Sequence, residues 1–125
     1  MRLTDSFLIV ESTQNTECGF EAVLRTNPEH PIYKAHFPGS PITPGVCVIQ
    51  AAGELLANKL GRKLYLQSIK NVKFLMVIIP EEGKKIKYNF SNIVEDENGV
   101  KAQVVVSDES TIYAKISLIF SNVRI

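Results

Sequence analysis

The run from His36 to Glu54 holds the side chains of this sequence whose types and spacing could do chemistry. Histidine exchanges protons near neutral pH, so His36 could serve as a general base. A Phe-Pro-Gly sequence at 37–39 follows it and is expected to fix the backbone around the imidazole. The alternative is a histidine with a structural role only. His30 lacks this setting and is predicted to be an ordinary loop residue.

A helix start follows in the same run. Thr43 offers a hydroxyl that could cap a helix, and Pro44 suits the first turn, where its missing N–H costs nothing. The first N–H groups of a helix lack acceptors and carry the positive end of its dipole. Gly45 would let a ligand approach them, and one such donor to an enolate oxygen is worth roughly 3 kcal/mol. The alternative is a capped helix start with no further role.

Gln50 and Glu54 lie one helical turn apart and therefore share a face of the predicted helix. Because the rest of that helix is apolar, two polar side chains on one side are expected to face something polar. Alternatively, Gln50 bonds a backbone group and Glu54 points to solvent at the helix end. Cys47 is predicted to be a small core residue.

The elements that must position these residues are one helix and several strands. The helix is predicted from Gly45 to Leu60, ending at Gly61, and its nearly continuous apolar surface predicts burial. Residues 27–43 are predicted to be an ordered loop, with hairpin turns at 15–19 and 95–99 and a turn at 80–83. Strands are predicted at 7–12, 20–26, 64–79, 85–94, 100–107 and 111–122. Short turns join the last four strands, which predicts an antiparallel sheet and an α+β fold.

Composition limits the other possibilities. At 125 residues the chain is expected to form one domain, 1–125, and its net charge of +1 does not predict nucleic-acid binding. Its longest apolar run, 74–79, is too short to span a membrane, and the first residues lack the apolar core of a secretion signal. Two cysteines without secretory cues favour reduced thiols in a cytoplasmic protein. The histidines and cysteines show no metal-ligand spacing.

The motif His-Phe-Pro-Gly at 36–39, followed by Pro44-Gly45 and an apolar helix, resembles the β-hydroxyacyl-acyl-carrier-protein dehydratases. Asn27 to Pro31 and Val72 to Phe74 also resemble that family. The resemblance implies a hotdog fold, in which one long buried helix is wrapped by a curved antiparallel sheet.

The resemblance also implies roles for individual residues. His36 matches the base that removes the α-proton of a (3R)-3-hydroxyacyl thioester, and Gly45 matches the glycine whose N–H polarises the thioester carbonyl. The family places its acid, Glu or Asp, fourteen residues after that histidine, where this chain has Gln50. One turn later the family usually has glutamine, and this chain has Glu54. Further residues expected to contact substrate are Phe37, Pro38, Gly39, Pro44 and Val46.

The exchange leaves the source of the leaving-group proton open. An amide cannot donate a proton as an acid does, so Gln50 is assigned to positioning and Glu54 is the candidate donor. Glu54 could reach back along the helix, a water could bridge Glu54 and Gln50, or His36 alone could carry the proton from carbon to oxygen.

The expected activity is therefore that of a lyase that converts 3-hydroxyacyl thioesters into trans-2-enoyl thioesters in fatty-acid or related acyl-chain synthesis. Two alternatives remain: an acyl thioesterase, and a non-catalytic or half-site subunit of a heterodimer with a Glu-bearing paralogue. Because open strand edges favour pairing, a homodimer or higher oligomer is expected.

The expected partners follow from the same resemblance. The acyl group would be carried by an acyl carrier protein or coenzyme A, with no cofactor, metal, membrane or nucleic acid involved. A basic surface could receive the acidic carrier, or could simply be solvated. Its candidate residues are Arg62, Lys63, Lys70, Lys73, Lys84 and Lys85.

Overall fold

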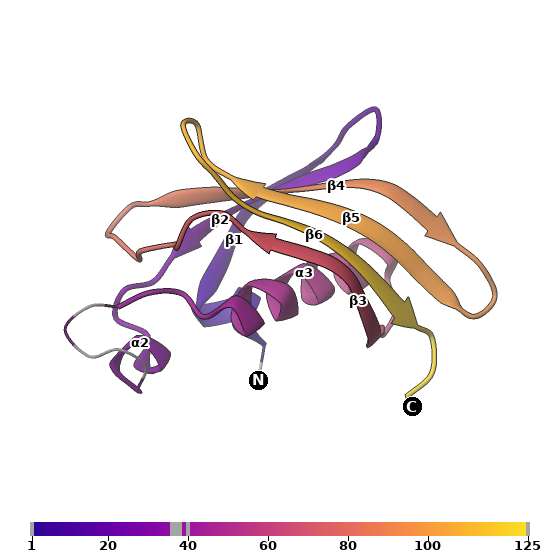
Figure 1. Cartoon of the computed structure of the whole chain (residues 1–125), viewed down its shortest axis with the longest axis horizontal. Helices are drawn as coiled ribbons and strands as arrows, with labels where there is room; N and C mark the ends of the chain where they lie inside the picture. The colour runs from indigo at the N-terminus through magenta and orange to yellow at the C-terminus, as the bar shows by residue number, and fades with distance from the viewer. Residues whose placement is uncertain (1, 36–38, 40, 125) are drawn as a thin grey trace.

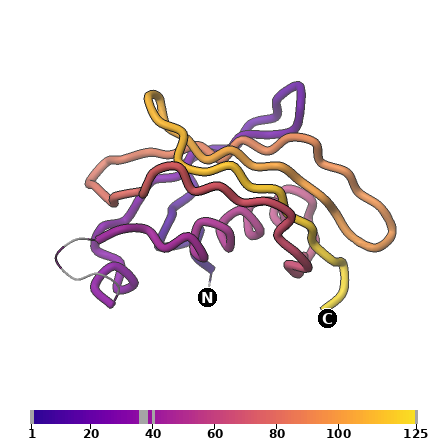
Figure 2. The backbone as a smooth tube through the Cα atoms, viewed as in Figure 1, coloured from indigo at the N-terminus to yellow at the C-terminus, as the bar shows by residue number. Residues whose placement is uncertain are grey.

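The computed structural model describes residues 2–35, 39 and 41–124. A six-stranded sheet arches over one long helix, α3 (Gly45–Leu60), as Figure 1 shows. Both described ends of the chain lie on the helix side of the sheet (Figure 2). The predicted α+β arrangement of one helix and a curved sheet is confirmed.

All strand pairs in the sheet are antiparallel, in the order β1-β2-β4-β5-β6-β3. The strands are β1 (Leu8–Asn15), β2 (Gly19–Thr26), β3 (Tyr65–Phe74), β4 (Lys85–Glu95), β5 (Gly99–Ser107) and β6 (Ile112–Ser121). The hairpins predicted at 15–19 and 95–99 are confirmed. In the second, the Asp96 carboxylate accepts the N–H groups of Asn98 and Gly99, which is the usual role of Asp in a turn.

The predicted strand at 64–79 is too long, because β3 ends at Phe74. It also does not pair with the strand that follows it in sequence. β3 pairs with β6, whereas β4 pairs with β2 and β5, so residues 75–84 cross between two parts of the sheet. The apolar run at 74–79 has strand-like composition, but pairing with distant β6 decides where the strand ends.

Two short helices were not expected: α1 (Leu3–Ser6) and α2 (Pro31–Ala35), the second inside the predicted loop. Pro31 takes the first helical position, and Nδ1 of His30 accepts the N–H of Ile32 at 3.1 Å. His30 is buried, and its ring packs edge-to-face with that of Phe7, with the two ring centroids 5.1 Å apart. The prediction that His30 is an ordinary loop residue is wrong, because it caps a helix.

One face of α3 packs against the sheet, and the hydroxyl of Tyr88 in β4 donates to Val48 O at 2.9 Å. The opposite face is exposed in the single chain, where Val46 is 72% accessible. Burial all round the helix was therefore a wrong expectation, since one sheet covers one side only. The predicted helix end is confirmed, with Gly61 in the left-handed region at φ 69°.

Thr43 does not cap α3 as predicted. The N-cap residue is Pro44, which makes no side-chain capping hydrogen bond. Thr43 Oγ1 instead shares a buried hydrogen bond of 2.9 Å with the Tyr33 hydroxyl, which joins α2 to the start of α3. Cys18 and Cys47 are both free thiols, and Cys47 is buried as predicted.

Candidate active site

The start of α3 presents backbone donors. Gly45 is the first helical residue, so its N–H has no acceptor within the helix. The N-cap residue Pro44 makes no side-chain hydrogen bond to this end, which carries the positive end of the helix dipole. The expectation that the Gly45 N–H polarises a carbonyl oxygen stays a prediction.

A cavity of about 600 Å³ opens at this helix start. Its walls come from the start of α3, the crossing segment after β3 and the beginning of β6. The lining residues are Ile42, Thr43, Pro44, Gly45, Val48, Phe74, Leu75, Met76, Val77, Ile78, Tyr113 and Ala114. Almost all of this lining is apolar, so the cavity suits a hydrocarbon chain whose polar end reaches the helix start.

Phe74, the last residue of β3, lies against Gly45. A Cβ atom built on Gly45 would stand 2.8 Å from Cζ of the Phe74 ring, which is closer than side chains normally approach. The ring is half-exposed and forms one wall of the cavity. Glycine at position 45 therefore has a packing reason as well as the proposed chemical one. The sequence pattern did not single out Phe74 for this position.

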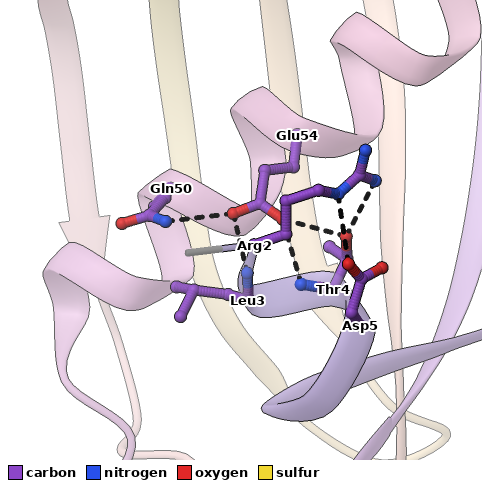
Figure 3. A network of polar contacts seen from close by, with 6 residues as sticks. All are labelled: Arg2, Leu3, Thr4, Asp5, Gln50 and Glu54. Atoms are coloured by element: carbon purple, nitrogen blue, oxygen red, sulfur yellow. Dashed lines mark hydrogen bonds and ion pairs between the residues drawn. The ribbon is translucent and has the colours of Figure 1, made fainter.

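Glu54 on α3 binds the N-terminal segment of the chain, as Figure 3 shows. Its Oε2 accepts the Leu3 N–H at 2.9 Å, and its Oε1 accepts both the N–H and the hydroxyl of Thr4 at 3.0 and 2.9 Å. Nε2 of Gln50 donates to Oε2 at 3.0 Å. The expectation that Gln50 and Glu54 share a face toward polar groups is confirmed, although the polar groups belong to α1.

The electrostatic state of Glu54 follows from these contacts. Partial burial raises the pKa of its carboxyl group, but the hydrogen bonds from Thr4, Leu3 and Gln50 outweigh burial and leave the pKa below its usual value. The ionised form is therefore favoured. The sequence-based assignment of Glu54 as proton donor stays a prediction, and these surroundings favour an acceptor.

The lowered pKa of the Glu54 carboxyl group predicts how the stability of the folded chain depends on pH. Because the carboxylate is stabilised only when folded, its contribution is complete above the unfolded pKa, near the usual 4.5, and is lost as pH falls through the lower folded value. Glu54→Gln lacks this contribution. Urea unfolding should therefore show a wild-type advantage at neutral pH that shrinks below about pH 4.5.

The matched control for that measurement is Glu97→Gln, which changes an exposed glutamate in the β4–β5 turn. It is expected to follow the wild type over the whole pH range. An advantage of wild type over Glu54→Gln that stays constant down to pH 3 would contradict a lowered pKa for Glu54.

A second cavity of about 520 Å³ lies along the exposed face of α3. It is lined by Gln50 and Glu54 together with Arg2 and the first residues of β3. Val46, expected to contact substrate beside Gly45, also faces this second cavity. Within one chain the structure therefore brings Pro44 and Gly45 to one cavity and Gln50, Glu54 and Val46 to another.

Other predicted site residues are placed only in part. His36, Phe37 and Pro38 lie outside the described residues. Gly39 is described and has φ 90°, a conformation that favours glycine.

The basic residues predicted to form a docking surface are spread out. Arg62 pairs with Glu95 at 2.7 Å, and Lys85 with Glu11 at 3.7 Å. Lys63, Lys70 and Lys73 line three different hollows. The docking surface stays a prediction.

Two further properties concern the described part of the chain. There, no group of three or more histidine, cysteine, aspartate or glutamate side chains is arranged to hold a metal ion. No described helix has the length and apolar character needed to cross a membrane.

Solved structures define the class to which this fold belongs. A dehydratase heterocomplex, ApeI:P, from Xenorhabdus doucetiae superimposes with a TM-score of 0.68 at 19% identity, over 91% of this chain and 97% of the other. A thioesterase from Haemophilus influenzae superimposes with a TM-score of 0.62 at 19% identity, over 92% and 78%. The fold is the α+β hotdog fold, which confirms that prediction.

Sequence comparison identifies the family within that class. The model of the ApeI-like family, described as ApeI dehydratase, matches residues 11–115, so the chain belongs to the ApeI-like dehydratase family. The 3-hydroxyacyl-[acyl-carrier-protein] dehydratase FabZ of Thermotoga neapolitana is 34% identical over 119 residues, 90% of this chain and 85% of its own length. The FabZ enzyme of Clostridium acetobutylicum is 29% identical over 119 residues, 88% and 84%.

Proposed function

We propose that the chain dehydrates (3R)-3-hydroxyacyl thioesters to trans-2-enoyl thioesters in acyl-chain synthesis. The observation that most strongly supports this reaction is the apolar cavity that ends at the start of α3, where Gly45 is the first backbone donor. An acyl chain fills such a cavity while its thioester carbonyl accepts the Gly45 N–H. Membership of a dehydratase family supports the same reaction class.

The reaction needs a base, an oxyanion donor and a route for one proton. His36 takes a proton from C2, and the electron pair left behind forms an enolate whose oxygen is stabilised by the Gly45 N–H. The enolate then forms the C2–C3 double bond while the C3–O bond breaks and its electrons leave with oxygen. The departing hydroxyl receives one proton and leaves as water.

His36 is the best-supported source of that proton among the three routes. Glu54 is ionised and already accepts four hydrogen bonds, which disfavours it as an acid, whether it acts directly or through a water. His36 carries the C2 proton after the first step and can return it to the hydroxyl oxygen, since both groups leave from the same side. Gln50 then orients the substrate hydroxyl and does not protonate it.

A complete site is proposed to form between two chains. β3 is an edge strand of the sheet, and its apolar residues Leu66, Ile69 and Val72 are exposed in the single chain. An apolar edge strand is stabilised by pairing, and a second copy of β3 would continue the sheet. Pairing would also cover the exposed face of α3, so that Gln50 and Glu54 of one chain complete the cavity of the other.

The acyl group is proposed to arrive on an acyl carrier protein or on coenzyme A, because both present a thioester on a long arm. Because the basic residues are spread over several hollows, they favour neither acyl carrier protein nor coenzyme A as the carrier. Comparing kcat/KM for the same acyl group on the two carriers distinguishes them.

The reaction is tested by offering one substrate and following two products. Purified protein receives a (3R)-3-hydroxyacyl pantetheine thioester, with the (3S) thioester as control. Enoyl absorbance is expected to rise with the (3R) substrate only, and no free thiol should appear. Release of thiol without enoyl product would instead indicate a thioesterase, and absence of both products would contradict the proposed reaction.

A half-site subunit is the second candidate, and Gln50 in the acid position is the observation that favours it. In that case this chain contributes its histidine to a site whose acid belongs to a Glu-bearing paralogue. The purified chain alone would then be inactive and would gain activity on mixing with that paralogue.

A further inference from the structure

We propose that the N-terminal segment, residues 2–6, is part of the active site, in which Thr4 and Glu54 are positioning residues that fix the orientation of the Gln50 amide. This inference rests on the proposed dehydration for its kinetic consequence, but its geometric part stands on contacts of described residues.

The segment is held firmly at a defined place. Leu3 and Phe7 are buried in the core, and Phe7 N–H donates to Leu3 O at 2.9 Å. Asn27 fixes the same stretch from the other side, since its side-chain amide donates to Ser6 O at 2.8 Å and its N–H to Phe7 O at 3.2 Å. The backbone N–H groups that face Glu54 are therefore presented by an anchored element.

The carboxylate of Glu54 is saturated by its four donors. A carboxylate has about four lone-pair positions, two on each oxygen. Here Oε2 accepts from Leu3 and Gln50, and Oε1 accepts twice from Thr4. A proton on Glu54 would have to displace one of these donors, so Glu54 is arranged to remain an acceptor.

The direction of the Thr4 hydroxyl is fixed as well. Arg2 Nη2 lies 3.4 Å from Thr4 Oγ1, and guanidinium is a donor only, so Thr4 accepts there. The hydroxyl proton of Thr4 must then point to Glu54. Arg2 is itself held by Asp5, with Nε 3.6 Å from Oδ2.

The state of Glu54 determines how the Gln50 amide is oriented. Because Glu54 accepts only, the NH₂ group of Gln50 faces it, and the amide oxygen turns away, as the close-up in Figure 3 shows. An amide oxygen has two acceptor positions, so at the acid position it can accept from a substrate hydroxyl in addition to any other donor. While it donates, the oxygen of that hydroxyl keeps a lone pair, which accepts the proton from His36 as the C3–O bond breaks.

The test is Thr4→Val, which removes one hydroxyl at nearly constant volume. Losing one hydrogen bond to Glu54 is expected to lower kcat by about threefold to tenfold with KM changed less than twofold. Thr4→Ser restores the hydroxyl and should restore kcat. The matched control is Thr26→Val, which removes another buried threonine hydroxyl, bonded to Glu81 O at 3.0 Å, and should leave kcat unchanged.

The sign of the change separates positioning from proton donation. If Glu54 donated the proton, losing the Thr4 hydroxyl would raise its pKa and should increase kcat, which would overturn the proposal. An unchanged kcat in an active enzyme would also overturn it, as would equal losses in Thr4→Val and Thr26→Val.

A second readout does not depend on activity. The side-chain NH₂ resonances of Gln50 should shift in Thr4→Val and keep their wild-type positions in Thr26→Val. If the wild type proves inactive, the proposed dehydration fails, and this readout alone decides whether residues 2–6 orient Gln50. Unshifted Gln50 resonances in Thr4→Val would overturn the proposal.

Discussion

Replacing His36 by alanine is expected to lower kcat for (3R)-3-hydroxyacyl thioesters by about 10²–10⁴-fold, the usual contribution of a positioned general base. The effect should reach the upper part of that range because His36 has two tasks in the proposed reaction. It removes the C2 proton and returns a proton to the leaving hydroxyl. Substrate binding should change little, since the acyl chain is held by the apolar cavity.

The other histidine provides the control. His30→Asn keeps a side-chain acceptor for the Ile32 N–H, so α2 should remain capped and kcat should stay near that of the wild type. Equal losses of kcat in His36→Ala and His30→Asn would indicate that both changes act through local folding. An unchanged kcat in His36→Ala would contradict the proposed base.

Gly45→Pro is expected to lower kcat by about 10²–10³-fold, because it removes the N–H that contacts the thioester oxygen. The backbone can accept this change. Proline is tolerated at the first helical position, and Pro44 before it is already extended, at φ −61° and ψ 140°. The loss should appear in kcat, because this donor stabilises the negative charge that develops on the oxygen during the reaction.

Gly45→Ala is the matched control for the donor. It introduces the same Cβ atom, 2.8 Å from Cζ of Phe74, but keeps the N–H. Since the Phe74 ring is half-exposed and can shift, the alanine variant should lose much less activity than the proline variant. Equal losses would mean that crowding by Phe74, and not the missing donor, explains the effect.

Local signals in the sequence predicted the parts of the fold that depend on neighbouring residues. The helix from Gly45 to Leu60 and its end at Gly61 are confirmed, because composition and the left-handed glycine are local properties. The turn at 95–99 is confirmed for the same reason. The start of α2 was missed although the sequence contains a signal for it, since Pro31 follows His30, whose side chain can accept a hydrogen bond.

Pairing between distant segments could not be predicted in the same way. The partner of β3 is β6, and the order of strands in sequence does not encode that choice. Likewise, Thr43 was predicted to cap α3, but its hydroxyl hydrogen-bonds to Tyr33, ten residues earlier in the sequence.

The candidate site shows the same division. The shared face of Gln50 and Glu54 follows from helical spacing alone and is confirmed by their hydrogen bond. The donors that saturate Glu54 come from Leu3 and Thr4, about fifty positions away in sequence, and no pattern in the first residues indicated that contact. The cavity wall formed by Phe74 likewise depends on the path of the chain after β3.

The most direct test of the proposed chemistry compares the wild type with Gln50→Glu in the same enoyl-absorbance assay. If His36 returns the proton and Gln50 only orients the hydroxyl, the wild type should turn over the (3R) thioester without a Glu-bearing paralogue. Gln50→Glu should then change kcat by less than about tenfold, below the contribution of an essential acid. A silent wild type that becomes active only as Gln50→Glu would contradict the His36 route and would show that this chain lacks its acid.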